Sequence, residues 1–328
     1  MTQGSFDDPV FALAADVGGT NMRAALVSRD GKVSARSDCD TEPESGIDDA
    51  ARRLGDLLVN AREAAGDAPV AGVGVSTAGP LDPSTGVYNH PPNLTGWHGH
   101  SLKPGLEKIL GVPVAIGHDA TLAALAETRF GPHRGAQNLL YVTVSTGVGG
   151  GIIANGQMVT GANGGAGEVG HITVRPGGQS CNVGCDGCFE GNASGTAIPR
   201  LAAAAVSDGR PSAMLDMAGG DPKKITARIV FDAADDGDAV AVEVRDLVIT
   251  NIGIGIGGLL NIFDPEALIL GGGVIDGLRN HWDKVEEAVR GHSLPRYREG
   301  VPIHVTTLGG DVSLLGAAEL AFRNAAAG

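Results

Sequence analysis

Residues Asp16–Arg23 read DVGGTNMR, and this stretch says more about the fold than any other in the chain. The apolar run Val10–Ala15 precedes it and predicts a buried strand. A second strand is predicted immediately afterwards, over Ala24–Ser28. The glycine-containing stretch is therefore the turn of a strand–turn–strand unit, where the backbone can come close to a ligand.

The turn has the composition of a phosphate-binding loop. Gly18 and Gly19 expose two backbone N–H groups, and Thr20 adds a hydroxyl. Asp16 is placed to hold Mg²⁺ directly or through water. A plain glycine hairpin is the alternative that this stretch leaves open when it is taken alone.

A second unit of the same kind occurs in the middle of the chain. A buried strand is predicted over Leu139–Val144, and it leads into STGVGGG at Ser145–Gly151 and then into Ile152 and Ile153. Two such units indicate a duplicated architecture in which each half offers one phosphate-binding hairpin to a shared cleft. The residues assigned to phosphate in the second hairpin are Ser145, Thr146 and Gly147.

The composition limits the class of protein. The 328 residues suffice for two domains, or for one large domain with an ample core. Glycine is unusually frequent, at 52 residues, and it is scattered, which favours tight turns and backbone close to ligands. The net charge of −14 argues against nonspecific nucleic-acid binding, because phosphate repels such a chain.

The apolar segments give no reason to expect a membrane protein. The N-terminal stretch MTQGSFDDPVFALAAD lacks the basic region and long apolar core of a signal peptide. The most apolar long stretch, Leu247–Phe263, is short for a membrane span and contains two asparagines and four glycines. We therefore expect a buried helix there and a cytoplasmic protein.

A cluster of metal-ligand types lies between Gly165 and Glu190. It contains Cys181, Cys185 and Cys188, with His171 ten residues before the first cysteine. Three thiolates and one imidazole make the four ligands that a tetrahedral structural Zn²⁺ prefers. Buried or redox-active cysteines are the alternative, although a redox CxxC needs neither a third cysteine nor a nearby histidine. Such a closed site would fix a loop and take no part in chemistry.

A proline- and glycine-rich loop, NHPPNLTGW at Asn89–Trp97, suits a sugar. The amide of Asn93 can bond to sugar hydroxyls, and the ring of Trp97 can lie on a sugar face. The alternative is a surface loop that Trp97 holds to the core.

Asp119 lies between a predicted strand, Val112–Ile116, and a predicted helix, Thr121–Arg129. An aspartate in this position is often only a helix N-cap. The functional alternative is a general base that points into a cleft.

Three glycines follow the predicted strand Ala267–Leu270, namely Gly271, Gly272 and Gly273. Bare backbone of this kind lets a flat ligand such as adenine lie against it. A turn needed only for helix packing is the alternative.

Taken together, these motifs resemble those of the ROK family (repressors, open reading frames and kinases), most closely its bacterial glucokinase branch. The resemblance extends from about Val10 to about Arg323. The matching motifs are Asp16–Arg23, Asn93–Trp97, Asp119–Ala120, Ser145–Gly151, Glu168–His171 (EVGH), Gly187–Glu190 (GCFE) and Ile262–Gly273 (IFDPEALILGGG).

The resemblance implies an α/β protein with the two-lobed actin-like (ribonuclease H-like) sugar-kinase fold. Mixed sheets flanked by helices would form two lobes with a cleft between them. Residues 1–118 with about 312–328 would form the small N-terminal lobe, and residues 119–311 the large C-terminal lobe with the zinc loop. The implied reaction is ATP-dependent phosphorylation of the 6-hydroxyl of glucose.

The resemblance also implies a role for each motif residue. Asp119 would accept the proton of the sugar 6-hydroxyl. His171 would use one ring nitrogen for zinc and the other for a sugar hydroxyl. The sugar would be bound by Asn93, His118, Asp119, Glu168, His171 and Glu190, and the structural Zn²⁺ by His171, Cys181, Cys185 and Cys188. ATP with Mg²⁺ would be bound by Asp16, Gly18, Gly19, Thr20, Asn21, Ser145, Thr146, Gly147, Gly271, Gly272 and Gly273.

Two positions depart from the family pattern. The family usually reads Cys-x-Cys-Gly-x-x-Gly-Cys. Here the middle cysteine is displaced to Cys185, and Val183 occupies its usual place. His118 stands where the family usually has an asparagine that touches a sugar hydroxyl, so the preferred hexose stays open.

Several alternatives follow from the same resemblance. N-acetylmannosamine, mannose or fructose could replace glucose, and polyphosphate could replace ATP. A sugar-sensing transcriptional regulator without its DNA-binding domain is the alternative of another class. It would need a helix-turn-helix before the first phosphate strand, where some nine residues precede Val10. The family's habit implies a homodimer or homotetramer. Neither nucleic acid nor a membrane is expected as a partner.

Overall fold

The structure, a computed structural model, describes residues 11–207 and 209–327. Val10 and most of the N-terminal stretch considered as a signal peptide lie outside the described residues. The chain forms two compact units: the first has residues up to Gln137, Gly151–Gly167 and those from Thr307 onward, and the second has Asn138–Gly150 and Glu168–Thr306. The lobe boundary between residues 118 and 119, and the cleft between lobes, stay predictions.

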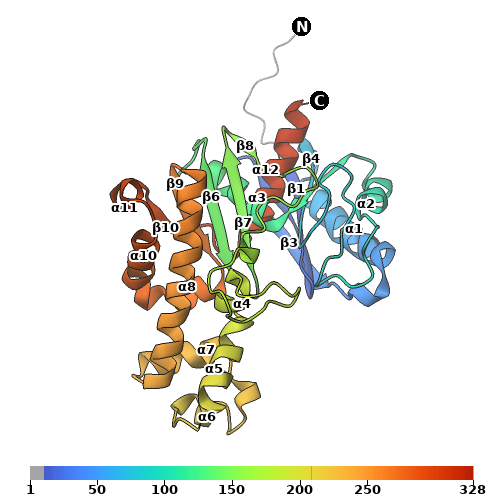
Figure 1. The fold of residues 1–328 in the computed structure, drawn as a ribbon. Coiled ribbons are helices and arrows are strands. Elements are labelled where there is room, and N and C mark those ends of the chain that lie inside the picture. The colour runs from blue at the N-terminus through green and yellow to red at the C-terminus, as the bar shows by residue number, and fades with distance from the viewer. Residues whose placement is uncertain (1–10, 208, 328) are drawn as a thin grey trace. The chain divides into compact units, whose positions relative to one another are not determined.

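The first unit is built on a mixed sheet of five strands in the order β3-β2-β1-β4-β5 (Figure 1). β1 pairs antiparallel with β2 and parallel with β4; β2 pairs antiparallel with β3, and β4 parallel with β5. The strands are β1 (Phe11–Val17), β2 (Asn21–Ser28), β3 (Val33–Asp40), β4 (Val70–Thr77) and β5 (Val114–His118).

Helices cover both faces of this sheet, because alternate side chains of a strand point to opposite sides. Leu13 and Val17 of β1 pack in one apolar cluster with Leu54 of α1. Ala12 and Ala14 pack in the other, with residues of α3 and α12. The helices of this unit are α1 (Ile47–Ala64), α2 (Lys103–Leu110), α3 (Asp119–Phe130) and α12 (Val312–Ala327), with 3-10 turns η1 (Pro43–Ser45) and η5 (Gly309–Asp311).

The second sheet is also mixed, with the order β10-β9-β6-β7-β8. β9 pairs parallel with both β6 and β10, and β7 pairs antiparallel with β8. Two mixed sheets flanked by helices confirm the predicted α/β class. The strands are β6 (Leu139–Val144), β7 (Val148–Ala154), β8 (Gln157–Met158), β9 (Ala267–Gly271) and β10 (Ile303–Val305).

The rest of the second unit is helical and is dominated by α8 (Ala239–Phe263) (Figure 1). By length and composition alone α8 could cross a membrane, but more than half of its most apolar window is buried. It packs against α4, α5, α7 and α10, as expected for the buried helix predicted over Leu247–Phe263. The other helices are α4 (Phe189–Ala193), α5 (Ala197–Ser207), α6 (Ala213–Met217), α7 (Ala227–Asp235), α9 (Gly273–Gly277), α10 (Trp282–Gly291) and α11 (Pro295–Gly300), with 3-10 turns η2 (Val169–His171), η3 (Pro222–Lys224) and η4 (Arg279–His281).

Candidate active site

The first glycine turn connects β1 and β2 as a tight hairpin. The N–H of Gly18 donates to the carbonyl of Asn21 at 3.0 Å, directly after the paired residues Val17 and Met22. Thr20 and Asn21 are exposed and Gly19 is half-buried, so the turn is open to a ligand. The hairpin predicted from the sequence is therefore present. The N–H of Gly18 closes the turn and is not exposed for phosphate as predicted, because the carbonyl of Asn21 accepts it. The other phosphate contacts stay a prediction.

Asp16, at the end of β1, is held by an arginine from β2. Arg23 donates to Asp16 Oδ2 through Nε and Nη2, both at 2.8 Å. Burial raises the pKa of the Asp16 carboxyl, the negative charge of Asp119 raises it further, and Arg23 opposes both effects. The Mg²⁺ contact of Asp16 stays a prediction, and one oxygen of its carboxylate already accepts both bonds from Arg23.

Asp119 begins α3 at the carboxyl end of β5. The N-cap position belongs to His118, which makes no capping bond with its side chain, and Asp119 Oδ1 accepts the N–H of Ala120 at 2.6 Å. The Asp119 side chain is 43% exposed, so it can reach a ligand. Asp119 is thus not simply an N-cap residue.

His118 is the neighbour that could distinguish one sugar from another. Its Nδ1 lies 3.5 Å from Asp119 Oδ1. Its ring packs on Gly79, where a Cβ would lie 2.5 Å from the ring carbon Cδ2. The absence of a side chain at position 79 therefore makes room for the imidazole beside Asp119.

The loop Asn89–Trp97 lies against the first glycine hairpin, in the same unit. A Cβ at Gly19 would be 2.8 Å from Cβ of Asn93, so glycine is required for this close approach. Asn93 is exposed, as its predicted role demands. Trp97, in contrast, is fully buried, and the suggestion that its ring lies on a sugar face is wrong. The alternative, a loop that Trp97 holds to the core, describes it correctly.

The second glycine turn, between β6 and β7, is bonded to Glu190. Ser145 N–H donates to the Gly147 carbonyl at 2.8 Å and closes the turn. Glu190 Oε2 accepts the N–H of Val148 at 3.0 Å, and a Cβ at Gly147 would collide with this oxygen. One carboxyl oxygen of Glu190 therefore supports the hairpin, while its predicted bond to a sugar hydroxyl is untested.

A cavity of about 500 Å³ opens beside this turn in the second unit. Its lining includes Ser145 and Thr146, which were predicted to bind phosphate, and Gly273, which was predicted to bind adenosine. Gly271 and Gly272 do not line the cavity. Position 272 requires glycine because its φ is 96° and because its backbone packs closely on the Val144 carbonyl. The other lining residues are Gly195, Thr196, Ala227, Arg228, Phe231, Asp232, Asp235, Val274, Gly277 and Asn280.

Part of this wall is one face of α7, and the sequence analysis assigned none of these α7 residues to a site. Arg228, Phe231, Asp232 and Asp235 follow one another at the spacing of one helix face. Because that spacing is visible in the sequence, it could have signalled a cavity wall, but an ordinary amphipathic helix has the same pattern.

Hydrogen bonds fix the deep end of the cavity. Asn280 Nδ2 donates to Asp235 Oδ2 at 3.1 Å, and His281 Nε2 lies 2.6 Å from Asp235 Oδ1. The hydrogen bond from His281 is the main cause that lowers the pKa of Asp235. Arg245, which is buried, lies 3.1 Å from His281 Nε2. An ionised carboxylate in a fixed orientation therefore faces any ligand here.

Three of the four predicted zinc ligands come together. The ligand atoms of His171, Cys181 and Cys185 all lie within 4.8 Å of one another. Cys181 Sγ is 3.7 Å from His171 Nδ1, close to the roughly 3.6 Å that tetrahedral Zn–S and Zn–N bonds impose. The other nitrogen, His171 Nε2, lies 3.6 Å from Glu168 Oε2. These residues fit a zinc ion, and the displaced Cys185 belongs to the group.

Cys188 lies outside that group of three. It is fully buried, and its sulfur accepts the N–H of Gly191 at 3.3 Å as the cap of α4. Burial raises the pKa of Cys188, whereas backbone groups of Cys185 and Val183 outweigh burial at Cys181 and lower its pKa to about 7. A low thiol pKa suits a metal ligand. The fourth ligand stays a prediction.

A family model described as the ROK family matches residues 12–324. The chain belongs to the ROK family. This membership accounts for the paired glycine hairpins, the aspartate that begins α3 and the cysteine–histidine group, which all fall within the matched range.

Individual relatives are similar over almost the whole chain. A glucokinase from Thermotoga maritima is 33% identical over 308 residues, which cover 94% of this chain and 96% of the relative. The crystal structure of a ROK hexokinase from Thermus thermophilus is 32% identical, with a TM-score of 0.83 over 97% of this chain and 100% of that one. A ROK glucokinase from Streptomyces griseus, in complex with glucose and AMPPNP, is 32% identical, with a TM-score of 0.79 over 95% and 99%. The fold is therefore the actin-like fold of ROK sugar kinases.

Proposed function

We propose that this protein is an ATP-dependent glucokinase that phosphorylates the 6-hydroxyl of glucose. The observation that carries the proposal is the exposed Asp119 carboxylate at the start of α3, in the unit that also contains the first glycine hairpin and Asn93. The similarity to the S. griseus glucokinase, bound to glucose and a non-hydrolysable ATP analogue, supports the choice of both substrates.

Phosphoryl transfer asks the protein mainly to align the two reactants and to neutralise charge. Asp119 would orient the sugar 6-hydroxyl and accept its proton as the bond to phosphorus forms. The proton goes from the hydroxyl oxygen to the carboxylate, and ADP leaves with the electrons of the broken P–O bond. Asn93, Glu168, His171 and Glu190 would hold the other hydroxyls, with His118 next to the reacting one.

The nucleotide would occupy the cavity beside the second hairpin. Its base and ribose would face α7 and Gly273, beside the second glycine turn. Backbone N–H groups of each glycine turn are the proposed phosphate donors. Mg²⁺, when bound, would neutralise phosphate charge, and the carboxylate of Asp16 is the hard oxygen donor that would hold it, directly or through water.

Zinc would be structural. His171, Cys181, Cys185 and Cys188 would hold it, and the ion would fix the loop that carries Glu168 and Glu190. The bond from Val148 to Glu190 links this loop to the second phosphate hairpin. The zinc loop would therefore orient sugar and phosphate contacts together.

The substrate is tested by measuring ADP release with glucose, mannose, fructose and N-acetylmannosamine, with ATP or polyphosphate as donor. We expect the highest kcat/KM with glucose and ATP. A higher kcat/KM for another hexose would transfer the proposal to that sugar, and His118 would be the first residue to examine. The absence of turnover with every pair would favour the sugar-sensing regulator.

Arg228→Ala should raise KM for ATP several-fold and leave kcat within about twofold. The side chain lines the cavity but is 89% exposed, so its removal should change stability by less than about 0.5 kcal/mol. Steady-state kinetics with varied ATP measure the effect. Arg210→Ala is the control, because Arg210 is exposed and pairs with Glu243 away from the cavity. Equal KM values for the two variants would contradict the nucleotide assignment.

The cytoplasm is the proposed location, and a homodimer or homotetramer is the proposed assembly. Nucleic acid and membranes are not proposed partners, because the net charge of −14 repels anionic surfaces. Size-exclusion chromatography with light scattering would measure the assembly directly.

A further inference from the structure

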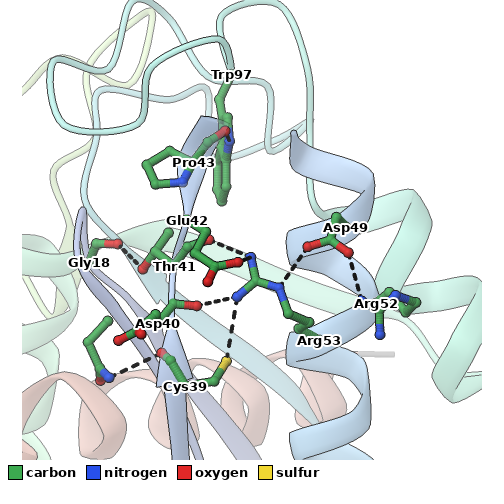
Figure 2. Close-up of polar contacts among 11 residues, drawn as sticks. Gly18, Cys39, Asp40, Thr41, Glu42, Pro43, Asp49, Arg52, Arg53 and Trp97 are labelled. Carbon is green, nitrogen blue, oxygen red and sulfur yellow. Dashed lines mark hydrogen bonds and ion pairs between the residues drawn. The ribbon is translucent and has the colours of Figure 1, made fainter. Parts of the chain in front are cut away.

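Arg53 of α1 contacts the segment that follows β3, and neither it nor that segment belongs to a motif described above. Its Nη1 donates to the carbonyl of Asp40, and its Nη2 donates to the carbonyl of Thr41 at 2.6 Å (Figure 2). Its Nε donates to Asp49 Oδ2 at 2.7 Å. With all three nitrogens engaged and its side chain only 17% exposed, the guanidinium is fixed in one orientation.

Thr41 connects the residues held by Arg53 to the first glycine hairpin through hydrogen bonds. Thr41 is fully buried; its N–H donates to the Thr20 carbonyl at 2.8 Å and its Oγ1 to the Gly18 carbonyl at 2.7 Å. In a planar trans peptide the C=O and the next N–H point in opposite directions. Holding the Gly18 carbonyl toward Thr41 therefore turns the Gly19 N–H, one of the groups assigned to phosphate, to the other side.

The same segment also holds the sugar loop. Nε1 of the buried Trp97 donates to the Pro43 carbonyl at 3.2 Å (Figure 2). The Trp97 ring packs edge-on against Tyr88, with centroids 5.3 Å apart. At the other end of the loop, Asn93 touches Gly19. Residues 40–43 therefore contact both loops that are assigned to the two reactants.

We propose that Arg53 is a positioning residue for phosphoryl transfer, because through residues 40–43 it fixes the Gly19 N–H relative to Asn93. Carbonyls at the end of a strand need donors when they are shielded from water, and bonds from a charged donor are the strong ones. A guanidinium group offers several hydrogen-bond donors in one plane, whereas an ammonium group does not have this planar arrangement. The inference rests on the proposed function, since it assigns phosphate to Gly19 and sugar to Asn93.

Arg53→Met removes the donors and keeps most of the side-chain volume. We expect kcat/KM for ATP and for glucose to fall by about 10- to 100-fold, because small displacements of reacting groups have effects of this size. The loss should appear in KM for both substrates together, since one anchor holds both loops. The thermal midpoint, measured by circular dichroism, shows how much of the variant is folded.

Arg52→Ala is the matched control. Arg52 is the neighbouring cation on the same helix; it also pairs with Asp49, but its side chain is 60% exposed and it reaches no carbonyl of residues 40–43. Its kinetic constants should equal those of the wild type. Arg53→Lys should recover part of the activity, because an ammonium group can reach one acceptor.

Thr41→Val tests the inference if Arg53→Met does not fold. It replaces the hydroxyl by a methyl group and so removes only the bond to Gly18. It should raise KM for ATP with little effect on KM for glucose. Wild-type constants in Thr41→Val, or in a folded Arg53→Met, would overturn the inference, as would a loss of activity that only follows the folded fraction.

AMPPNP titration by calorimetry separates this inference from the proposed function. If the wild type binds AMPPNP and Arg53→Met binds it with the same Kd, the inference fails alone. If the wild type binds neither AMPPNP nor glucose, the proposed function fails, and the assignment of Arg53 fails with it.

Discussion

Asp119→Asn is expected to lower turnover by about 100- to 10,000-fold, the range that general-base catalysis contributes. Asparagine has the size of aspartate, but its amide cannot accept the proton of the 6-hydroxyl. The position at the start of α3, with the N–H of Ala120 bonded to Asp119 Oδ1, should hold an amide oxygen in the same way. The fold should therefore be unchanged, and so should most of the affinity for glucose.

The measurement is steady-state ADP release, with glucose affinity determined by calorimetry. Asp67→Asn, an exposed aspartate in the turn after α1, is the control and should behave as the wild type. Turnover within a few-fold of wild type in Asp119→Asn would remove Asp119 from its catalytic role. A loss of glucose binding as large as the loss of turnover would indicate that Asp119 only binds the sugar.

Cys181→Ser is expected to abolish zinc binding and to weaken glucose binding at least tenfold. Cys181 Sγ lies 3.7 Å from His171 Nδ1, so the substitution removes one of the three grouped ligand atoms. Structural zinc contributes on the order of 10 kcal/mol in small zinc-dependent folds. Without it, the loop that carries Glu168 and Glu190 should lose its fixed form, and the thermal midpoint should fall.

Zinc per chain is measured by atomic emission, and KM for glucose by the kinetic assay. Cys39→Ser is the control, because Cys39 lies in the first unit, away from the cysteine–histidine group. It should keep all of the zinc. Wild-type protein that contains no zinc when purified without chelator would contradict the metal assignment, as would Cys181→Ser that retains it.

The elements that the sequence predicted best are those with their own local signal. The apolar run at Leu139–Val144 predicted β6 with both of its ends, and the helix predicted over Leu247–Phe263 forms the C-terminal part of α8. Buried strands and long amphipathic or apolar helices carry such signals because their periodicity is set by the faces that they bury.

The helix α6 depends on a contact from far along the chain. No element was predicted there. Its first N–H groups donate to the side chains of Ser212 and of Asp238, which lies 25 residues after Ala213. The role of Asp238 cannot be identified from the sequence around α6.

In the candidate site, too, features with a local sequence signal were predicted, and features that depend on distant contacts were not. Single motifs predicted the two hairpins, Asp119 and the cysteine–histidine group. The contact between Gly19 and Asn93, and the bonds of Arg53 to residues 40–43, arise only when the fold brings distant segments together. Trp97 shows the opposite error, a single residue that was assigned a binding role. A large aromatic ring can pack on a sugar or in an apolar core, and here Trp97 packs in the core.

The most direct test of the account is the product formed from glucose and ATP by the zinc-containing protein, identified by phosphorus and carbon NMR. We predict one ADP and one glucose 6-phosphate per reaction, at a rate far above that of Asp119→Asn. Phosphate on another hydroxyl, or ADP formed no faster than by Asp119→Asn, would contradict it.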